Sequence, residues 1–185
     1  MENPSQDIRR VVRELAEPAS AEAMLAAVDK YFTPDAQIVY PVFNSPKASG
    51  REGVKAGYKM LRVLSYGNKI EFHAVAFDQV TVEKGLERMK GFLDFTEHLK
   101  VRFFPVPDSY NPWFHFRFIT RIDLVKNPSD GKWYVEKQED NLPTDFGSTG
   151  LHFLPFDVQI SNAVKWATGT GTLLVGGTLA KLKIL

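Results

Sequence analysis

The sequence contains no cysteine, which excludes disulfide bonds and thiolate metal sites. It also lacks an excess of charge of either sign, because 23 Lys and Arg against 22 Asp and Glu give a formal net charge of +1. The charge balance therefore gives no reason to expect a nucleic-acid partner, and no basic stripe is interleaved with the aromatic residues. Residues 1–7 have neither the basic segment nor the apolar segment of a secretory signal, so we expect an intracellular, cytoplasmic protein.

Motifs for metals and nucleotides are lacking as well. The four histidines are scattered without metal-ligand spacing, so we predict no metal. The Gly169-Thr-Gly171 stretch follows no strand and precedes no acidic residue, so it is not a dinucleotide fingerprint. There is no P-loop, and residues 147–150 lack the spacing of a nucleophile elbow. We therefore predict that no cofactor is needed.

Two long runs of alternating apolar and polar residues dominate what is present. In residues 86–103 one register is apolar and the other carries charge, and residues 114–124 repeat the pattern. Successive side chains on a strand point to opposite faces, so each run is predicted to be a long strand with one dry and one charged face. The charged register, with His98, His115, Arg117, Arg121 and Asp123, is predicted to be solvated or to face a second subunit through cross-strand charge pairs.

The rest of the chain predicts a cover for the dry face. Helices are expected after Asn3-Pro4, after Ser20, and after a capping box formed by Ser49 and Glu52. Shorter strands are expected at residues 37–43, where Pro41 indicates an edge or a bulge, and at 70–77 and 132–140. At 185 residues, one main domain over residues 1–150 with an extension over 151–185 is expected.

The extension contains a stretch without charge, residues 166–180, which holds four glycines. It is shorter than the roughly 20 apolar residues of a membrane span. Two alternatives stay open: an interfacial membrane anchor that ends in Lys181 and Lys183, or a tail or helix packed on the domain or on a partner subunit.

Several motifs carry a family resemblance: residues 3–8 (Asn-Pro-Ser-Gln-Asp-Ile), 30–36 (Lys-Tyr-Phe-Thr-Pro-Asp-Ala), 73–78 (His-Ala-Val-Ala-Phe-Asp) and 138–140 (Gln-Glu-Asp). They resemble the fungal SigF-like members of the NTF2-like (SnoaL-like) superfamily over about residues 3–142. Family members often have His-Pro where this chain has Tyr40-Pro41. The resemblance implies an α+β cone, in which three N-terminal helices pack on a strongly curved mixed sheet around a pocket. It also implies that the opposite sheet face often forms a homodimer.

Glu97 is the one charge in the apolar register from Met89 to Phe103. A carboxylate on a dry face loses solvation, so its pKa should rise, which suits a general acid or base. The alternative is a β-bulge, invited by Gly91, that would turn Glu97 outward.

Three further residues are candidate catalytic groups. His73 falls on the strand face opposite Ile70, Phe72, Ala74 and Ala76 and is either structural or a proton carrier. The Tyr40 hydroxyl is a candidate to orient a carbonyl, or the residue simply packs in the core. Asp140, near the end of a strand, is either catalytic or a solvated loop carboxylate.

Together with the resemblance, these residues predict a cofactor-independent enzyme of natural-product biosynthesis. It would catalyse a cyclisation, a pericyclic (Diels-Alder-type) reaction or an isomerisation of an apolar polyketide- or terpenoid-type substrate. The pocket would hold the reacting groups of this substrate in near-attack geometry. The alternative is a non-catalytic lipid-binding protein peripheral to a membrane. The residues expected to line the substrate pocket are Tyr58, Met89, Leu93, Phe95, Phe116, Phe118 and Thr120.

Overall fold

The structure, a computed structural model, describes residues 1–41, 43–102 and 105–142, and short helical stretches at 159–160, 162–164, 166–168 and 170–171. Contacts within the chain divide it into one unit of Met1–Thr144 and a second of Asp145–Leu185. None of the described helices is both long and apolar enough to cross a membrane. Contact of the extension with a membrane, with the domain or with a partner subunit stays a prediction.

The first unit is built on β5 (Leu86–Val101) and β6 (Phe114–Lys126), the two strands expected from the alternating runs. They pair antiparallel without a register shift from Arg88↔Val125 to Leu99↔Phe114. Every second residue of β5 from Met89 to Leu99 is buried, and β6 follows the same alternation. The predicted dry face is therefore confirmed, and it extends across both strands.

The other strands extend this pair into a mixed sheet. In the described chain the order is β2-β1-β7-β6-β5-β3. The short β4 (Thr81–Glu83) pairs with the first three residues of β5. β7 (Trp133–Asn141) is antiparallel to β6, and β1 (Phe32–Tyr40) is parallel to β7. β2 (Phe43–Asn44) follows the turn at Pro41 and β3 (Ser65–Phe77) lies beside β5. The strong curvature of the expected cone stays a prediction.

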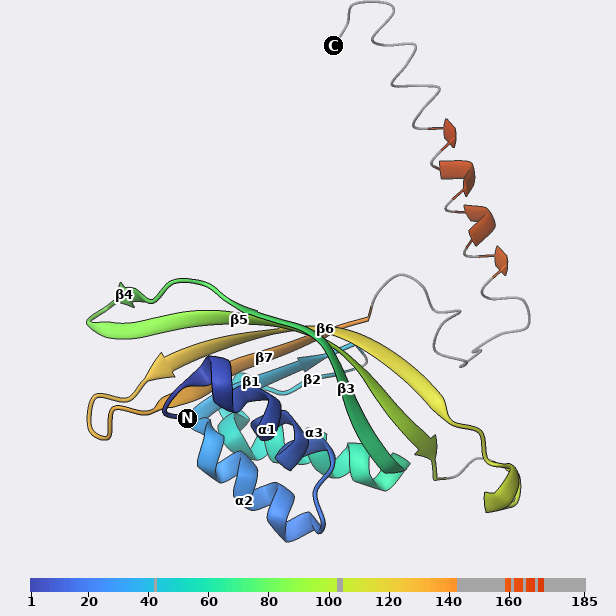
Figure 1. Ribbon diagram of the computed structural model, residues 1–185, viewed down its shortest axis with the longest axis horizontal. Coiled ribbons are helices and arrows are strands. Elements are labelled where there is room, and N and C mark those ends of the chain that lie inside the picture. The colour runs from blue at the N-terminus through green and yellow to red at the C-terminus, as the bar shows by residue number, and fades with distance from the viewer. Residues whose placement is uncertain are drawn as a thin grey trace, which may run out of the picture. The chain divides into compact units, whose positions relative to one another are not determined.

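Three helices lie against one side of this sheet: α1 (Pro4–Ala16), α2 (Ala21–Tyr31) and α3 (Gly50–Leu64) (Figure 1). Their apolar stripes face the dry side of the sheet, because residues such as Ile8, Val28 and Val54 are fully buried in the core. The fold is thus the predicted α+β arrangement of three N-terminal helices on a mixed sheet. Single 3₁₀ turns at Lys47–Ser49 and Asp108–Tyr110 complete the described elements.

The helix starts were predicted with mixed success. Ser20 caps α2, since its hydroxyl accepts a hydrogen bond from the Ala23 N–H at 3.1 Å. The predicted capping box at Ser49 is wrong, because the Ser49 hydroxyl instead donates to the carbonyl of Pro46 at 2.5 Å. A preceding 3₁₀ turn places Ser49 in helical conformation, so its side chain is directed away from the first free N–H groups of α3.

The prediction for the faces of β3 is wrong beyond Phe72. Phe72 pairs with Phe95 and Ala74 with Asp94, so His73 is an extra residue in a β-bulge. The bulge exchanges the two faces: Ala74 and Ala76 are exposed, while Val75 and Phe77 pack against the core. The bulge that sequence reasoning considered for β5 therefore lies in its neighbour.

Candidate functional site

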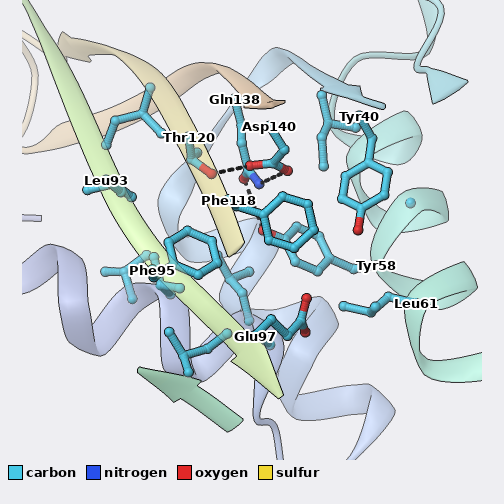
Figure 2. Close-up of a pocket in the computed structure, with 18 of the residues that line it drawn as sticks. Tyr40, Tyr58, Leu61, Leu93, Phe95, Glu97, Phe118, Thr120, Gln138 and Asp140 are labelled. Atoms are coloured by element: carbon cyan, nitrogen blue, oxygen red, sulfur yellow. Dashed lines mark hydrogen bonds between the residues drawn. The ribbon is translucent and has the colours of Figure 1, made fainter. Parts of the chain in front are cut away.

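A cavity of about 170 Å³ lies between the helices and the dry face of the sheet. Its wall is mostly aliphatic and aromatic, with residues from α1, α3 and five strands. Figure 2 shows Glu97, Tyr40 and Asp140 entering the same central space from different elements. The polar or charged side chains in the described wall are Tyr40, Tyr58, Glu97, Thr120, Gln138 and Asp140.

Glu97 points into this cavity from β5 and is only 5% exposed. The unbroken β5–β6 register contradicts the alternative of an outward turn at a bulge. Burial raises the pKa of Glu97 to about 7, and the charges of Asp140 and Glu17 act in the same direction. The Asn68 amide opposes this rise, since its Nδ2 donates to Glu97 Oε1 at 2.9 Å.

Asn68 was not identified from the sequence. It lies in an irregular part of β3, where the pairing with β5 shifts between Tyr66 and Lys69. Gly67 precedes it with a φ of 67°, a conformation that favours glycine. The irregularity directs the Asn68 side chain toward Glu97. A Gly-Asn pair just before an alternating strand was the available signal for it.

Asp140 lies on β7 and is 7% exposed, which contradicts the alternative of a solvated loop carboxylate. Thr120 Oγ1 donates to Asp140 Oδ1 at 2.5 Å, and Gln138 Nε2 donates to Asp140 Oδ2 at 2.8 Å. Burial raises the pKa of Asp140 to about 6, while these two hydrogen bonds limit the rise. Gln138 was missed, although its position two residues before Asp140 places both on one strand face.

Two tyrosines complete the polar part of the wall. The Tyr58 hydroxyl, from α3, donates to Gln138 Oε1 at 3.0 Å. The ring of Tyr40, from β1, lies 5.6 Å from that of Phe118. Burial, together with the nearby carboxylates, raises the pKa of both phenols above the ordinary tyrosine range, so both stay protonated near neutral pH.

The other predicted site residues divide into two groups. Leu93, Phe95, Phe118 and Thr120 line the cavity, as does Tyr58. Met89 is buried in the core and Phe116 stacks on Phe118 with ring centroids 6.5 Å apart, but neither lines the cavity. Residues on the α1 side, Ile8, Val11 and Leu15, also line it and were not predicted to do so.

His73 lies outside the cavity wall. Its side chain is exposed, with Nε2 2.7 Å from Thr96 Oγ1. The same charged face carries a His98–His115 contact of 2.6 Å between Nδ1 atoms and a two-fold ion pair of Arg117 with Asp94, as cross-strand pairing predicts. Among the residues described, no group of His, Cys, Asp and Glu could hold a metal ion. A catalytic role for His73 stays a prediction, and His73 does not line the cavity between the helices and the sheet.

The arrangement combines two buried carboxyl groups with protonated phenols in an apolar enclosure. No Lys, Arg or His is present in the described wall, so neither carboxyl has a cation beside it there. Both carboxyls have raised pKa values, and Asp140 accepts two side-chain hydrogen bonds where Glu97 accepts one, so the pair is suited to divide acid and base roles.

Comparison with known proteins gives a family match for the chain. The chain matches the family described as "SigF NTF2-like domain" over residues 1–183. A comparison with curated proteins finds no match.

Solved structures share the fold at low sequence identity. An NTF2-like superfamily protein from Salmonella enterica serovar Typhimurium LT2 is 12% identical, with a TM-score of 0.56 over 75% of this chain and 89% of its own. A hexachlorocyclohexane dehydrochlorinase is 11% identical, with a TM-score of 0.54 over 82% and 90% of the two chains. A proposed scytalone dehydratase from Novosphingobium aromaticivorans DSM 12444 is 16% identical, with a TM-score of 0.51 over 75% and 83%. The fold is thus one that small enzymes share.

Proposed function

The chain belongs to the family of SigF NTF2-like domains, and on that premise we propose that it is a cofactor-independent isomerase or cyclase of a small apolar molecule. The substrate would be an intermediate of the kind made in natural-product biosynthesis. The observation that carries the proposal is the pair of buried carboxyls, Glu97 and Asp140, in one apolar cavity.

The hydrogen bonds of the two carboxyls suggest which is the base and which is the acid. Asp140, whose pKa is about 6, is the base, because two donors already stabilise its ionised form. Glu97, whose pKa is about 7, is the acid or hydrogen-bond donor to a carbonyl oxygen, assisted by the Tyr40 hydroxyl. A proton leaves the carbon next to the carbonyl for Asp140. Its return at another carbon of the conjugated system gives the isomer.

The cavity volume narrows the substrate. A buried apolar cavity of about 150 Å³ holds one benzene molecule, and this one measures about 170 Å³. The volume therefore favours a substrate with one enclosed ring rather than the polyene or polycycle considered from the sequence. The rings of Phe95 and Phe118, 5.8 Å apart, offer an aromatic wall to such a ring.

The fold neighbours lend support of a general kind. Two of them are named for eliminations, a dehydrochlorinase and a dehydratase. An elimination needs a base to take a proton and an acid to assist the leaving group. The same two roles are assigned here to Asp140 and Glu97.

Proton abstraction can be tested without the natural substrate. Cyclohexanone in D₂O exchanges the hydrogens next to its carbonyl only if a base removes them, and ¹H NMR follows their loss. The protein should accelerate the exchange, Asp140→Asn should lower the catalysed rate by about 100-fold or more, and Glu97→Gln by about 10-fold or more. Asp35→Asn and Glu22→Gln, the same changes at exposed positions, should leave it unaltered. Equal rates in all five proteins would contradict the proposal.

The same assay has an expected pH dependence. The base must be ionised, so the rate should fall as the pH drops below about 6, the pKa of Asp140. The acid must be protonated, so the rate should also fall as the pH rises above about 7, the pKa of Glu97. Glu97→Gln should remove the loss on the alkaline side. A wild-type rate that keeps rising from pH 6 to pH 9 would rule out Glu97 as the acid.

The second candidate, a lipid-binding protein at a membrane surface, is favoured by one observation. Ile160, Val164 and Trp166 in the extension are apolar and 58%, 56% and 74% exposed. Apolar side chains of this kind can enter a lipid interface. Phosphatidylcholine vesicles should then sediment the wild-type chain but not the variant with all three changed to Ser, whereas Tyr110→Ser, at another exposed aromatic, should behave as wild type. A wild-type chain that stays in the supernatant would exclude this candidate.

A further inference from the structure

We infer that the cavity selects single-ring ligands that carry no negative charge and rejects carboxylates of the same shape. This inference concerns the same site as the proposed function and adds the class of ligand. It rests on the composition of the wall, the volume of the cavity and the exposure of two wall residues.

The charges of the wall disfavour an anion in two ways. Glu97 and Asp140 are both on the wall, and no described wall residue is Lys, Arg or His. A carboxylate that enters would lose its hydration without gaining a cation, and would meet the ionised Asp140. Like charges brought together at a buried site cost several kcal/mol.

The hydrogen-bond donors of the wall do not compensate this cost, because Tyr40 offers at most one neutral hydroxyl and the other donors are committed to wall residues. The Gln138 amide donates to Asp140, and the Tyr58 hydroxyl donates to Gln138. The Thr120 hydroxyl is also committed, since it donates to Asp140. The wall is therefore built to hold negative charge on its own residues, and it suits a ligand that is neutral or positively charged.

Two exposed residues of the wall indicate how such a ligand enters. Met60 and Leu64 on α3 line the cavity and are also 54% and 48% exposed. Entry beside these two side chains would let the ring pass between apolar groups and reach the carboxyls inside. Figure 2 shows Leu61, from the same helix, beside Tyr58 and facing Glu97 across this space. A one-ring ligand matches the 170 Å³ available.

Three planar compounds of one shape test the inference: benzamide, which is neutral, benzoate, which is anionic, and benzamidinium, which is cationic. Isothermal titration calorimetry at pH 8 should find that benzamide and benzamidinium bind, and that benzoate binds at least about 100-fold more weakly than benzamide. In the Glu97→Gln/Asp140→Asn double variant the order should change, because benzamidinium loses affinity and benzoate gains it. The matched control, Glu22→Gln/Asp35→Asn, removes two exposed charges and should keep the wild-type order.

Each other result counts against the inference. Benzoate binding as tightly as benzamide to the wild type would overturn the charge selection. An unchanged order in the double variant, shown to be folded by circular dichroism, would remove the two carboxyls as its cause. Failure of benzamide to bind would overturn the one-ring size. Because these readouts are binding alone, they stand even if cyclohexanone exchange is not catalysed.

Discussion

At the scale of single residues, the orientation of one amide decides how Asp140 is held. Gln138 can present either its carbonyl oxygen or its NH₂ group to Asp140, and only the NH₂ group stabilises a carboxylate. The Tyr58 hydroxyl donates to Gln138 Oε1, which leaves Nε2 facing Asp140 Oδ2. Tyr58 is therefore a positioning residue, which acts on Asp140 through Gln138.

Tyr58→Phe should raise the pKa of Asp140. Without the phenol donor, the Gln138 amide is free to turn its oxygen toward Asp140, and the carboxylate loses a hydrogen bond. The ¹³C chemical shift of the Asp140 carboxyl, followed against pH, should show a midpoint that is higher by about half a unit to one unit than in the wild type. Tyr31→Phe removes a buried hydroxyl that bonds to Arg10 and Glu14 instead, and should leave the midpoint in place.

The Gln138→Met variant tests whether Tyr58 changes the pKa of Asp140 through Gln138. This variant should raise the Asp140 midpoint by itself, and adding Tyr58→Phe should raise it no further, because the shared partner is already gone. Two shifts that add in full would mean that Tyr58 acts on Asp140 by another route. An unshifted midpoint in Tyr58→Phe alone would refute its positioning role.

The sequence singled out the two carboxyls of the site but neither of its two amides. Glu97 is conspicuous because a carboxyl within an apolar strand register is an exception that calls for a cause. Asp140 was a candidate only through its position near the end of a strand. Asn68 and Gln138 are amides, which occur in strands and turns without any such conflict. Their role depends on which side chains they meet in the folded chain, and that is fixed only by the packing of α3, β3, β5 and β7.

At the scale of elements, the bulge in β3 sets which side chains cover one end of the core. His73 is the extra residue between the pairs Phe72↔Phe95 and Ala74↔Asp94. Beyond it, Val75 pairs with Leu93, and Phe77 pairs with Gly91, whose missing side chain leaves room for the Phe77 ring. A strict alternation predicted the opposite faces, because one inserted residue exchanges inside and outside for the rest of a strand.

Two single-residue deletions test this description. Deleting His73 should restore regular alternation while keeping Val75 and Phe77 inside, so the free energy of unfolding should fall by less than about 1 kcal/mol. Deleting Ala76 should place Phe77 opposite Phe92, on the exposed face, at a cost of about 2 kcal/mol in lost burial. Urea unfolding followed by circular dichroism measures both values. A larger loss for the His73 deletion than for the Ala76 deletion would contradict the bulge.

The elements themselves were largely predictable, since each follows from a local pattern. The dry faces of β5 and β6 and the cap of α2 at Ser20 are confirmed because alternation and capping act within a few residues. The bulge was not predictable in the same way. It is defined by two strands together, and the sequence of β3 alone carries no sign of which residue is left unpaired.

At the scale of the whole molecule, the two carboxyls in the cavity destabilise the first unit when they are ionised. Three helices and the sheet enclose two carboxyls without a cation in the described wall, so ionising either group inside the fold is unfavourable. The surrounding core, from Ile8 and Val28 to Leu93 and Leu124, must hold the structure together at pH values where both groups are charged. Stability should therefore depend on pH in a direction opposite to that of a protein held by salt-bridged carboxylates.

The free energy of unfolding should decrease as the pH rises from about 5 to 8. Folding raises the pKa of Glu97 from 4.5 to about 7 and that of Asp140 from 3.8 to about 6. Between these values the folded chain binds more protons than the unfolded chain, so the contribution of each group is complete at low pH and is lost as the pH passes the folded pKa. Between pH 5 and pH 8 the loss is about 2 to 3 kcal/mol for Glu97 and about 1 to 2 kcal/mol for Asp140, because part of the Asp140 contribution is already lost at pH 5.

Urea unfolding at pH 5 and pH 8 measures this change. Glu97→Gln/Asp140→Asn should show a much smaller difference between the two pH values than the wild type, because amides of similar shape have no charge to gain. Above pH 5 the ion-paired surface carboxylates, such as Asp94 with Arg117, are already ionised in both states and contribute little to the slope. A wild-type stability that is equal or higher at pH 8 would show that the two carboxyls are not enclosed as described, and the acid–base proposal would lose its physical basis.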